Sequence, residues 1–183
     1  GYSTVYPGAY GQYVLMSGPM LLRVPDGLAD TTAATTEPCA VGLHAVRQGE
    51  MKPGEAAIVV GAGPIGLMTL IWLKKEGVAH VTVSDYAPTR RELAAKLGAD
   101  LVVDPAKDDL AAVHLAATGA AAPAVFECVG VEGTLHQAMQ LVERGGRVTN
   151  TQFPEFGLPN ISGQIQRLDE PGRPEIRQSN RGP

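Results

Sequence analysis

Residues 56–73 read AAIVVGAGPIGLMTLIWL, and this stretch decides the fold. An uncharged run of this length is a candidate for a membrane-spanning helix. Three glycines and a proline interrupt it, however, at Gly61, Gly63, Pro64 and Gly66. A buried strand, a tight turn and a buried helix account for the same apolar content. We therefore expect a strand over 56–60, a turn, and a helix that ends near residue 76, with no membrane span.

The same strand-then-helix pattern recurs along the chain. Short runs rich in Val and Ile predict further strands at 80–84, 100–103, 124–128 and 147–151. Helical patterns fill the intervals, and the last one has apolar residues at i, i+3, i+4 and i+7: Leu135, Ala138, Met139 and Val142. This alternation is typical of an α/β fold with a doubly wound parallel sheet of the Rossmann type.

The end of the chain departs from this pattern. Residues 152–183 contain five Pro and four Gly without a sustained period. They predict an irregular tail in place of a last strand, so that the Rossmann domain is incomplete. We interpret the tail as foreign to the fold, the product of an altered reading frame or a truncated gene. The predicted organisation is a partial domain over 1–36, a Rossmann domain over 37–151 and a tail over 152–183.

Charge and cysteine usage restrict the classes of partner. The 183 residues carry 19 acids and 15 bases, a net charge of −4, which offers no basic surface for a nucleic-acid backbone. Cys39 and Cys128 lie too far apart for a CxxC metal site and form no disulfide framework. The first ten residues lack the pattern of a secretory signal. We expect a cytoplasmic protein without a nucleic-acid or membrane partner.

The glycine turn is the motif that carries chemistry. Gly61, Gly63 and Gly66 have the GxGxxG spacing, between a predicted strand and a predicted helix. In a dinucleotide-binding turn the first glycine permits the tight bend and the second lets a pyrophosphate approach the backbone. The third allows close packing of helix and strand, and the helix N-terminus faces the anion. The alternative is a plain strand-to-helix turn without a ligand.

Asp85 stands at the end of the second strand, 19 residues after Gly66. A carboxylate there can accept hydrogen bonds from both hydroxyls of an adenine ribose and repels a 2′-phosphate, which favours NAD over NADP. The nearby Arg90 and Arg91 argue in the opposite direction. Asp85 can also be a turn former at the end of a strand. A methyltransferase-like domain that binds a different adenosine cofactor shares both features and is a further alternative.

Longer segments resemble the zinc-containing medium-chain dehydrogenases, in particular their polyol, threonine and butanediol branch. The resemblance covers about residues 8–150. It rests on GAYGQYVLM at 8–16, VPDGLADTTAATTEPCAVGLHAV at 24–46, the run at 51–85 that contains the glycine turn, RRELAAKLGAD at 90–100 and VFECVG at 125–130.

The resemblance implies hydride transfer between NAD and a small secondary alcohol or polyol, with zinc polarising the alcohol oxygen. It also implies a homo-oligomer, and it makes residues 1–36 a fragment of the catalytic domain that precedes the NAD-binding domain. By position, Asp85 and Arg90 resemble the adenosine contacts, and Glu37 resembles the acid that binds zinc or its water. Val129 and Gly130 resemble the edge of the nicotinamide side. The residues that resemble the pyrophosphate loop are Gly61, Gly63, Pro64, Ile65 and Gly66.

Zinc is doubtful in this chain. The family's other zinc ligands belong upstream of the tyrosine-rich start, and a catalytic zinc generally needs three protein ligands. Glu37, Cys39 and His44 lie close in sequence, but their spacing does not obviously point all three inward. A dinucleotide-binding module without catalysis is therefore the alternative function. We interpret His44 as a packed helix residue, His136 as solvent-facing and both cysteines as buried small apolar residues.

The helix over 67–73 is apolar nearly all the way round. Such a helix is covered on more than its sheet side. In the family, another domain or subunit provides this cover. We therefore expect that without it the exposed face favours association.

Overall fold

The computed structural model describes residues 12–13, 16, 18–151, 165–170 and 173–177. The chain divides into two compact units, Gly1–Thr36 and Glu37–Pro183. The described part of the first unit contains a 3-10 helix, η1 (Gly18–Met20), and a short helix, α1 (Asp30–Ala33). The assignment of this unit to a catalytic domain stays a prediction.

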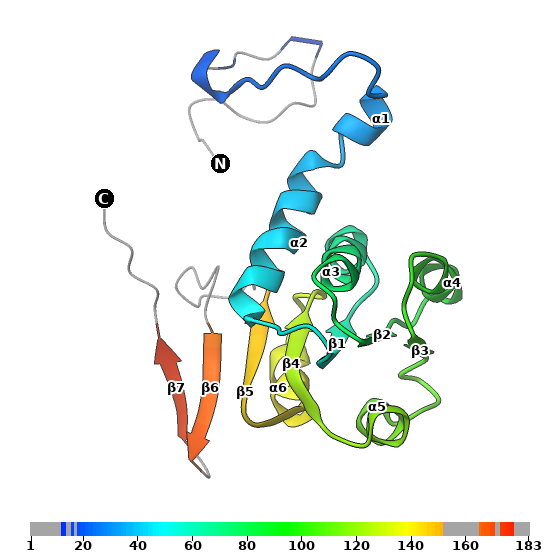
Figure 1. Cartoon of the computed structure of the whole chain (residues 1–183), viewed down its shortest axis with the longest axis vertical. Helices are drawn as coiled ribbons and strands as arrows, with labels where there is room; N and C mark the ends of the chain where they lie inside the picture. The colour runs from blue at the N-terminus through cyan, green and yellow to red at the C-terminus, as the bar shows by residue number, and fades with distance from the viewer. Residues whose placement is uncertain (1–11, 14–15, 17, 152–164, 171–172, 178–183) are drawn as a thin grey trace. The chain divides into compact units, whose positions relative to one another are not determined.

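The second unit is built on a seven-stranded sheet (Figure 1). After α2 (Thr36–Gly49), strands and helices alternate. They are β1 (Ala56–Val60), α3 (Pro64–Lys75), β2 (His80–Ser84), α4 (Pro88–Lys96), β3 (Leu101–Val103), α5 (Leu110–Thr118), β4 (Ala122–Glu127), α6 (Thr134–Leu141), β5 (Val142–Asn150), β6 (Ile165–Glu170) and β7 (Arg173–Arg177).

The strand order is β3-β2-β1-β4-β5-β6-β7, and the first five strands are parallel. The chain passes from β1 outward to β3 and then crosses to β4 on the other side of β1. This reversal defines a doubly wound sheet and creates a switch point between β1 and β4, where such folds bind ligands. The predicted fold class is confirmed.

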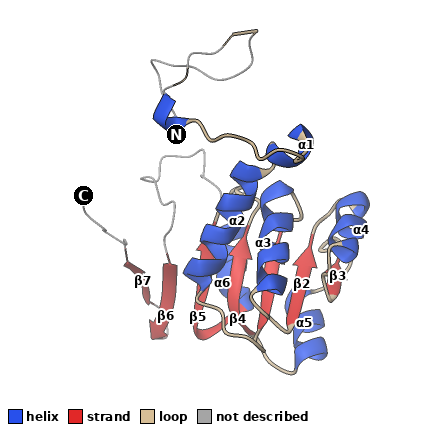
Figure 2. Ribbon diagram, turned by 45° about the horizontal axis from the view of Figure 1, so that its top comes forward, coloured by secondary structure: helices blue, strands red, loops and turns tan. Residues whose placement is uncertain are grey.

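Two helical layers cover the sheet (Figure 2). Ala57 and Val59 of β1 point into a core shared with α2, α3 and α4, whereas Ile58 and Val60 pack in a second core with α5 and α6. Alternate side chains of a strand point to opposite faces, so an unbroken apolar strand requires cover on both. This double burial explains why β1 is apolar throughout.

The apolar helix α3 is covered from within its own unit. A Cβ on Gly42 of α2 would come within 2.8 Å of the backbone of Met68 and Thr69, so the two helices touch backbone to backbone. Trp72 Nε1 donates a hydrogen bond to the carbonyl oxygen of Cys39 at 3.0 Å. No residue from 67 to 73 is exposed. The expectation of an exposed face on this helix is therefore wrong, because α2 supplies the cover; a homo-oligomer stays a prediction.

The structure also corrects the boundary between α6 and β5. Val142, expected on the apolar face of the helix, has an extended backbone and begins β5. The register between β4 and β5 shifts at this point, from Ala122 opposite Val142 to Ala124 opposite Arg147. Gly145 has a φ of +78°, which permits the local reversal that an L side chain disfavours. Val142 still packs in the second core, which is why its position fits a helical period.

The segment 152–183 contains two strands where an irregular tail was predicted. β6 pairs antiparallel with β5, and β7 pairs antiparallel with β6. Prolines and glycines obscure the alternation of such short strands in the sequence. Among the helices that the structure describes, none is both long and apolar enough to cross a membrane.

Candidate dinucleotide-binding site

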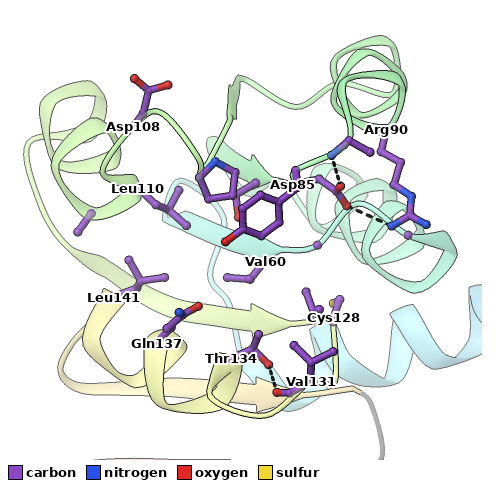
Figure 3. A pocket seen from close by; sticks show the side chains of 18 of the residues that line it. Val60, Asp85, Arg90, Asp108, Leu110, Cys128, Val131, Thr134, Gln137 and Leu141 are labelled. Atoms are coloured by element: carbon purple, nitrogen blue, oxygen red, sulfur yellow. Dashed lines mark hydrogen bonds and ion pairs between the residues drawn. The ribbon is translucent and has the colours of Figure 1, made fainter.

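A cleft of about 1000 Å³ opens at the carboxyl ends of β1, β2 and β4. Figure 3 shows Asp85 and Arg90 on one wall and Thr134, Gln137 and Leu141 of α6 across from them. Of the nine predicted cofactor residues, five line the cleft: Gly61, Gly63, Asp85, Arg90 and Val129. The cleft lining does not include the other four, which are Pro64, Ile65, Gly66 and Gly130.

The three glycines of the turn have different surroundings, and the predicted pyrophosphate contact stays a prediction. Gly61 has a φ of +92°, and a Cβ there would also come within 2.7 Å of Cγ2 of Val129. A Cβ on Gly66 would overlap the carbonyl oxygen of Gly61, so only glycine lets α3 pack this closely on the turn. In contrast, a Cβ on Gly63 would meet nothing within 4 Å. Gly63 therefore leaves open space in the cleft beside the start of α3.

Asp85 joins two elements at the cleft. One carboxylate oxygen, Oδ2, accepts a hydrogen bond from the backbone NH of Ala62 in the glycine turn at 2.8 Å. The other, Oδ1, accepts one from the NH of Ala87 at 2.8 Å, which fixes the turn after β2. The turn-forming role considered from the sequence is thus present. An ionised carboxylate has about four lone-pair sites, so both oxygens retain capacity for ribose hydroxyls.

The two arginines after β2 have different environments. Arg90 is largely exposed, lines the cleft and lies 3.6 Å from Oδ2 of Asp85. Arg91 is held elsewhere: its Nη1 donates to the carbonyl oxygens of Asp85 and Tyr86, both at 2.7 Å. Its Nη2 forms an ion pair with Asp104 at 3.0 Å. Only Arg90 of the two therefore faces the cleft.

The turn after β4 is organised by a buried acid. Glu127 is 1% exposed, and its Oε1 accepts hydrogen bonds from the backbone NH groups of Val129 and Gly130 at 2.7 and 3.0 Å. These NH groups are engaged within the protein, so Val129 presents its side chain to the cleft and Gly130 shapes the turn. Their predicted place at the nicotinamide side stays a prediction.

Sequence reasoning missed several residues that line the cleft. Tyr86 and Val131 are exposed and apolar, and Pro105, Leu110, Thr134 and Gln137 come from the α5 and α6 side. The available signal was topological, because the carboxyl ends of all parallel strands meet at one edge of the sheet. Every loop after a strand was therefore a candidate.

Cys128 also lines the cleft, at the end of β4. Burial raises the pKa of its thiol to about 12, with a smaller effect from the nearby Glu127 carboxylate. The thiol is therefore protonated at neutral pH and acts as a small apolar residue, as predicted. Cys39 is only half-buried, so its predicted burial is partly wrong.

The histidines have three different environments. His44 is exposed and its Nε2 lies 2.8 Å from Nε2 of Gln48, so the interpretation as a packed helix residue is wrong. His136 is exposed, as predicted. His114 is 1% exposed, and its Nδ1 lies 2.8 Å from Oγ1 of Thr82. Burial, with the neighbouring His80, lowers the pKa of His114.

The described residues do not fit a catalytic zinc. Glu37 is exposed in the first turn of α2, and the cleft lining does not include it. Within the described ranges, no group of three or more His, Cys, Asp or Glu side chains is placed to hold a metal ion. A zinc site that uses Glu37 would need ligands beyond these residues.

Comparison with known proteins agrees with this architecture. The family model described as "Zinc-binding dehydrogenase" matches residues 64–167, a range that includes the start of β6. (R,R)-butanediol dehydrogenase of Bacillus subtilis is 36% identical over 151 residues, which cover 82% of this chain and 43% of that protein. The crystal structure of 2R,3R-butanediol dehydrogenase from the same species matches 75% of this chain and 40% of its own, with a TM-score of 0.67 and 37% identity.

Two further solved structures carry a cofactor. A short chain alcohol dehydrogenase of Escherichia coli CFT073, complexed with NADH, has a TM-score of 0.64 at 26% identity and covers 70% of this chain and 38% of its own. A structure described as that of a zinc-binding dehydrogenase from Sinorhizobium meliloti 1021, bound to NADP, has a TM-score of 0.58 at 31% identity. It covers 68% of this chain and 37% of its own.

The fold and the cleft define a Rossmann-type domain of the dehydrogenase class. The chain belongs to the zinc-binding dehydrogenase family. It spans about two fifths of the length of these relatives.

Proposed function

We propose that this chain forms the dinucleotide-binding part of an NAD-dependent dehydrogenase that oxidises a small secondary alcohol or polyol. The observation that carries the proposal is the open space at the Cβ position of Gly63, in the same turn whose Ala62 NH donates a hydrogen bond to the Asp85 carboxylate. The substrate class is taken from the similarity to butanediol dehydrogenase. Bound NAD supplies the hydride acceptor of the reaction.

The chain's own residues would hold the two ends of the adenosine diphosphate. The space at Gly63 and the N-terminus of α3 suit the pyrophosphate, because the first NH groups of a helix have no acceptor within the helix. Asp85 would accept the ribose hydroxyls. Tyr86, exposed directly after β2, offers an aromatic face for the adenine ring.

The charges in the cleft favour NAD over NADP. A 2′-phosphate would lie against the Asp85 carboxylate, and like charges at short distance disfavour binding. Arg91 cannot offset this repulsion, because its guanidinium group is already engaged by Asp104 and two carbonyl oxygens. Arg90 is the remaining arginine at the cleft wall, and Asp85 already pairs with it. The Arg90 guanidinium group is thus partly neutralised by the Asp85 carboxylate, which would itself repel a 2′-phosphate.

The test is a titration of the purified chain with NADH, NADPH and S-adenosylmethionine, followed by the fluorescence of Trp72, the single tryptophan. We expect saturable binding of NADH, with NADPH weaker and S-adenosylmethionine without effect. Elemental analysis of the same sample measures zinc. Preference for S-adenosylmethionine would support the methyltransferase-like alternative, and preference for NADPH would overturn the cofactor assignment.

A further inference from the structure

Arg91 and Asp104 connect two loops that line the cleft, one after β2 and the other after the neighbouring strand β3. Arg91 lies in the first half of α4, and Asp104 follows β3 directly. Their ion pair measures 3.0 Å, with the side chains only 16% and 13% exposed. Partial burial makes such a pair more directional and less screened than a surface contact.

The Arg91 end of this pair fixes the loop after β2. Nη1 donates to the carbonyl oxygens of both Asp85 and Tyr86 at 2.7 Å. These are the residues whose side chains face the cleft, whereas Arg91 itself does not line it. Arg91 therefore acts on the cleft through the backbone of its neighbours.

The Asp104 end fixes the loop after β3. Oδ1 of Asp104 accepts a hydrogen bond from the backbone NH of Ala106 at 3.1 Å, and Oδ2 pairs with Arg91 and, at 3.6 Å, with Lys107. The bond to Ala106 spans Pro105, which lines the cleft. One side-chain pair thus joins both loops at neighbouring strand ends.

We infer that the Arg91–Asp104 pair is a positioning brace that sets the separation of these two loops for the adenosine half of the dinucleotide. This inference rests on the proposed function. Without the brace, the carbonyl groups of Asp85 and Tyr86 lose their common donor, so the backbone that carries both side chains is less firmly held. Nucleotide binding would then have to order the loop after β2, and the entropy lost in ordering it would lower the affinity.

The role of Arg91, the second arginine after β2, differs from the one that its position in the sequence suggests. Adjacent arginines near a predicted ribose site suggest recognition of a 2′-phosphate. Here the Asp104 carboxylate neutralises one of them and directs it away from the cleft. The brace therefore contributes to NAD selectivity as well as to affinity.

The chain offers a matched control for the loss of an ion pair. Lys74 of α3 pairs with Asp100, just before β3, at 2.9 Å, with side chains 30% and 33% exposed. Neither residue lines the cleft. Lys74→Met removes a comparable pair between a helix and the same edge of the sheet without touching the two loops.

The experiment measures dissociation constants for NADH and ADP-ribose by calorimetry, with thermal unfolding of each variant as a stability reference. We expect Arg91→Met to weaken both ligands by about tenfold, within the range reported for mutations that act on a site from outside it. Arg91→Lys keeps a charge for Asp104 but lacks the fork that reaches two carbonyl oxygens, so we expect an intermediate loss. Lys74→Met should leave both constants close to those of the unmutated chain.

Each outcome decides the inference. Unchanged affinity in a folded Arg91→Met variant, or an equal loss in Lys74→Met, overturns it. If Arg91→Met does not fold, Arg91→Lys and Asp104→Asn are compared with Lys74→Met in its place. Affinities equal to those of the unmutated chain in both variants overturn the inference. Failure of the unmutated chain to bind NADH or ADP-ribose overturns the proposed function itself, which distinguishes the two failures.

Discussion

Asp85 and Ala62 are joined by a hydrogen bond of 2.8 Å from the backbone NH of Ala62 to the Asp85 carboxylate. The bond ties the end of β2 to the middle of the glycine turn, 23 residues earlier. The predicted ribose acceptor is thus fixed against the predicted pyrophosphate loop before any ligand binds. Groups held in place in this way cost little ordering entropy on binding.

Replacement of Asp85 by Asn tests the charge of this group. The amide keeps an oxygen that can accept from one backbone NH but removes the negative charge. We expect the affinity for NADPH relative to NADH to rise by at least about tenfold, because that ratio needs only about 1.4 kcal/mol of relieved repulsion and like charges at short distance cost several kcal/mol. Dissociation constants for both nucleotides measure the ratio. The control is Asp108→Asn, on the α5 side of the same cleft; an equal change in ratio there would contradict the assignment.

Gly63 and Gly66 form a matched pair for substitution by Ala. Gly63 has a φ of −72° and open space at its Cβ, so Gly63→Ala should fold with unchanged or slightly higher stability, by up to about 1 kcal/mol. It should nevertheless lose NADH affinity, because the methyl group enters the space assigned to the pyrophosphate. Gly63→Ala with wild-type affinity would show that this space is not used.

Gly66→Ala should behave in the opposite way. Its methyl group would overlap the carbonyl oxygen of Gly61, which is backbone and cannot rotate away. We expect a loss of about 1–3 kcal/mol in the free energy of unfolding, as for other overpacked cores. Chemical denaturation measures it. Stability equal to that of Gly63→Ala would contradict the close packing of α3 on the turn.

Cys128 should resist alkylation in the folded protein. With a pKa of about 12, on the order of one thiol in ten thousand is ionised at pH 8, and thiolate is the reactive form. Mass spectrometry after treatment with iodoacetamide should find Cys128 unmodified until the chain is unfolded in guanidinium. Rapid native modification of Cys128 would contradict its burial.

His114 should make the fold sensitive to acid. Its pKa in the folded state is lowered by burial and by His80, so the unfolded chain takes up a proton near pH 6.5 while the folded chain does not. The contribution of neutral His114 to the free energy of unfolding is therefore fully present above pH 6.5. It decreases as the pH falls below 6.5, by at most about 1.4 kcal/mol per pH unit. His114→Gln should reduce this slope. The exposed His136→Gln should preserve it, and equal slopes in all three proteins would contradict the prediction.

The sequence predicted β1 and β2 to the residue because their signals are local. Both are short strands with two valines each between turn-forming residues, and each is followed by a helix that begins with proline. The start of β5 could not be predicted in this way. Val142 fits a helical period and is buried in either conformation, so only the pairing with β4 decides its state.

The candidate site likewise has one part that local sequence signals predict and another that depends on the pairing of distant segments. The glycine turn and Asp85 lie within one strand-helix-strand unit, which the sequence displays directly. The walls from α5 and α6 arise from the crossover between β3 and β4, which brings distant segments to the switch point. The role of Arg91 depends on its distance from Asp104, thirteen positions along the chain, and no sequence spacing reports that contact.

The most direct test of the central claim is a crystal structure of the chain grown with NADH. The account predicts electron density for the pyrophosphate beside Gly63 and for the adenine ribose within hydrogen-bond distance of Asp85. An empty cleft at saturating NADH, or a nucleotide bound away from the glycine turn, would contradict it.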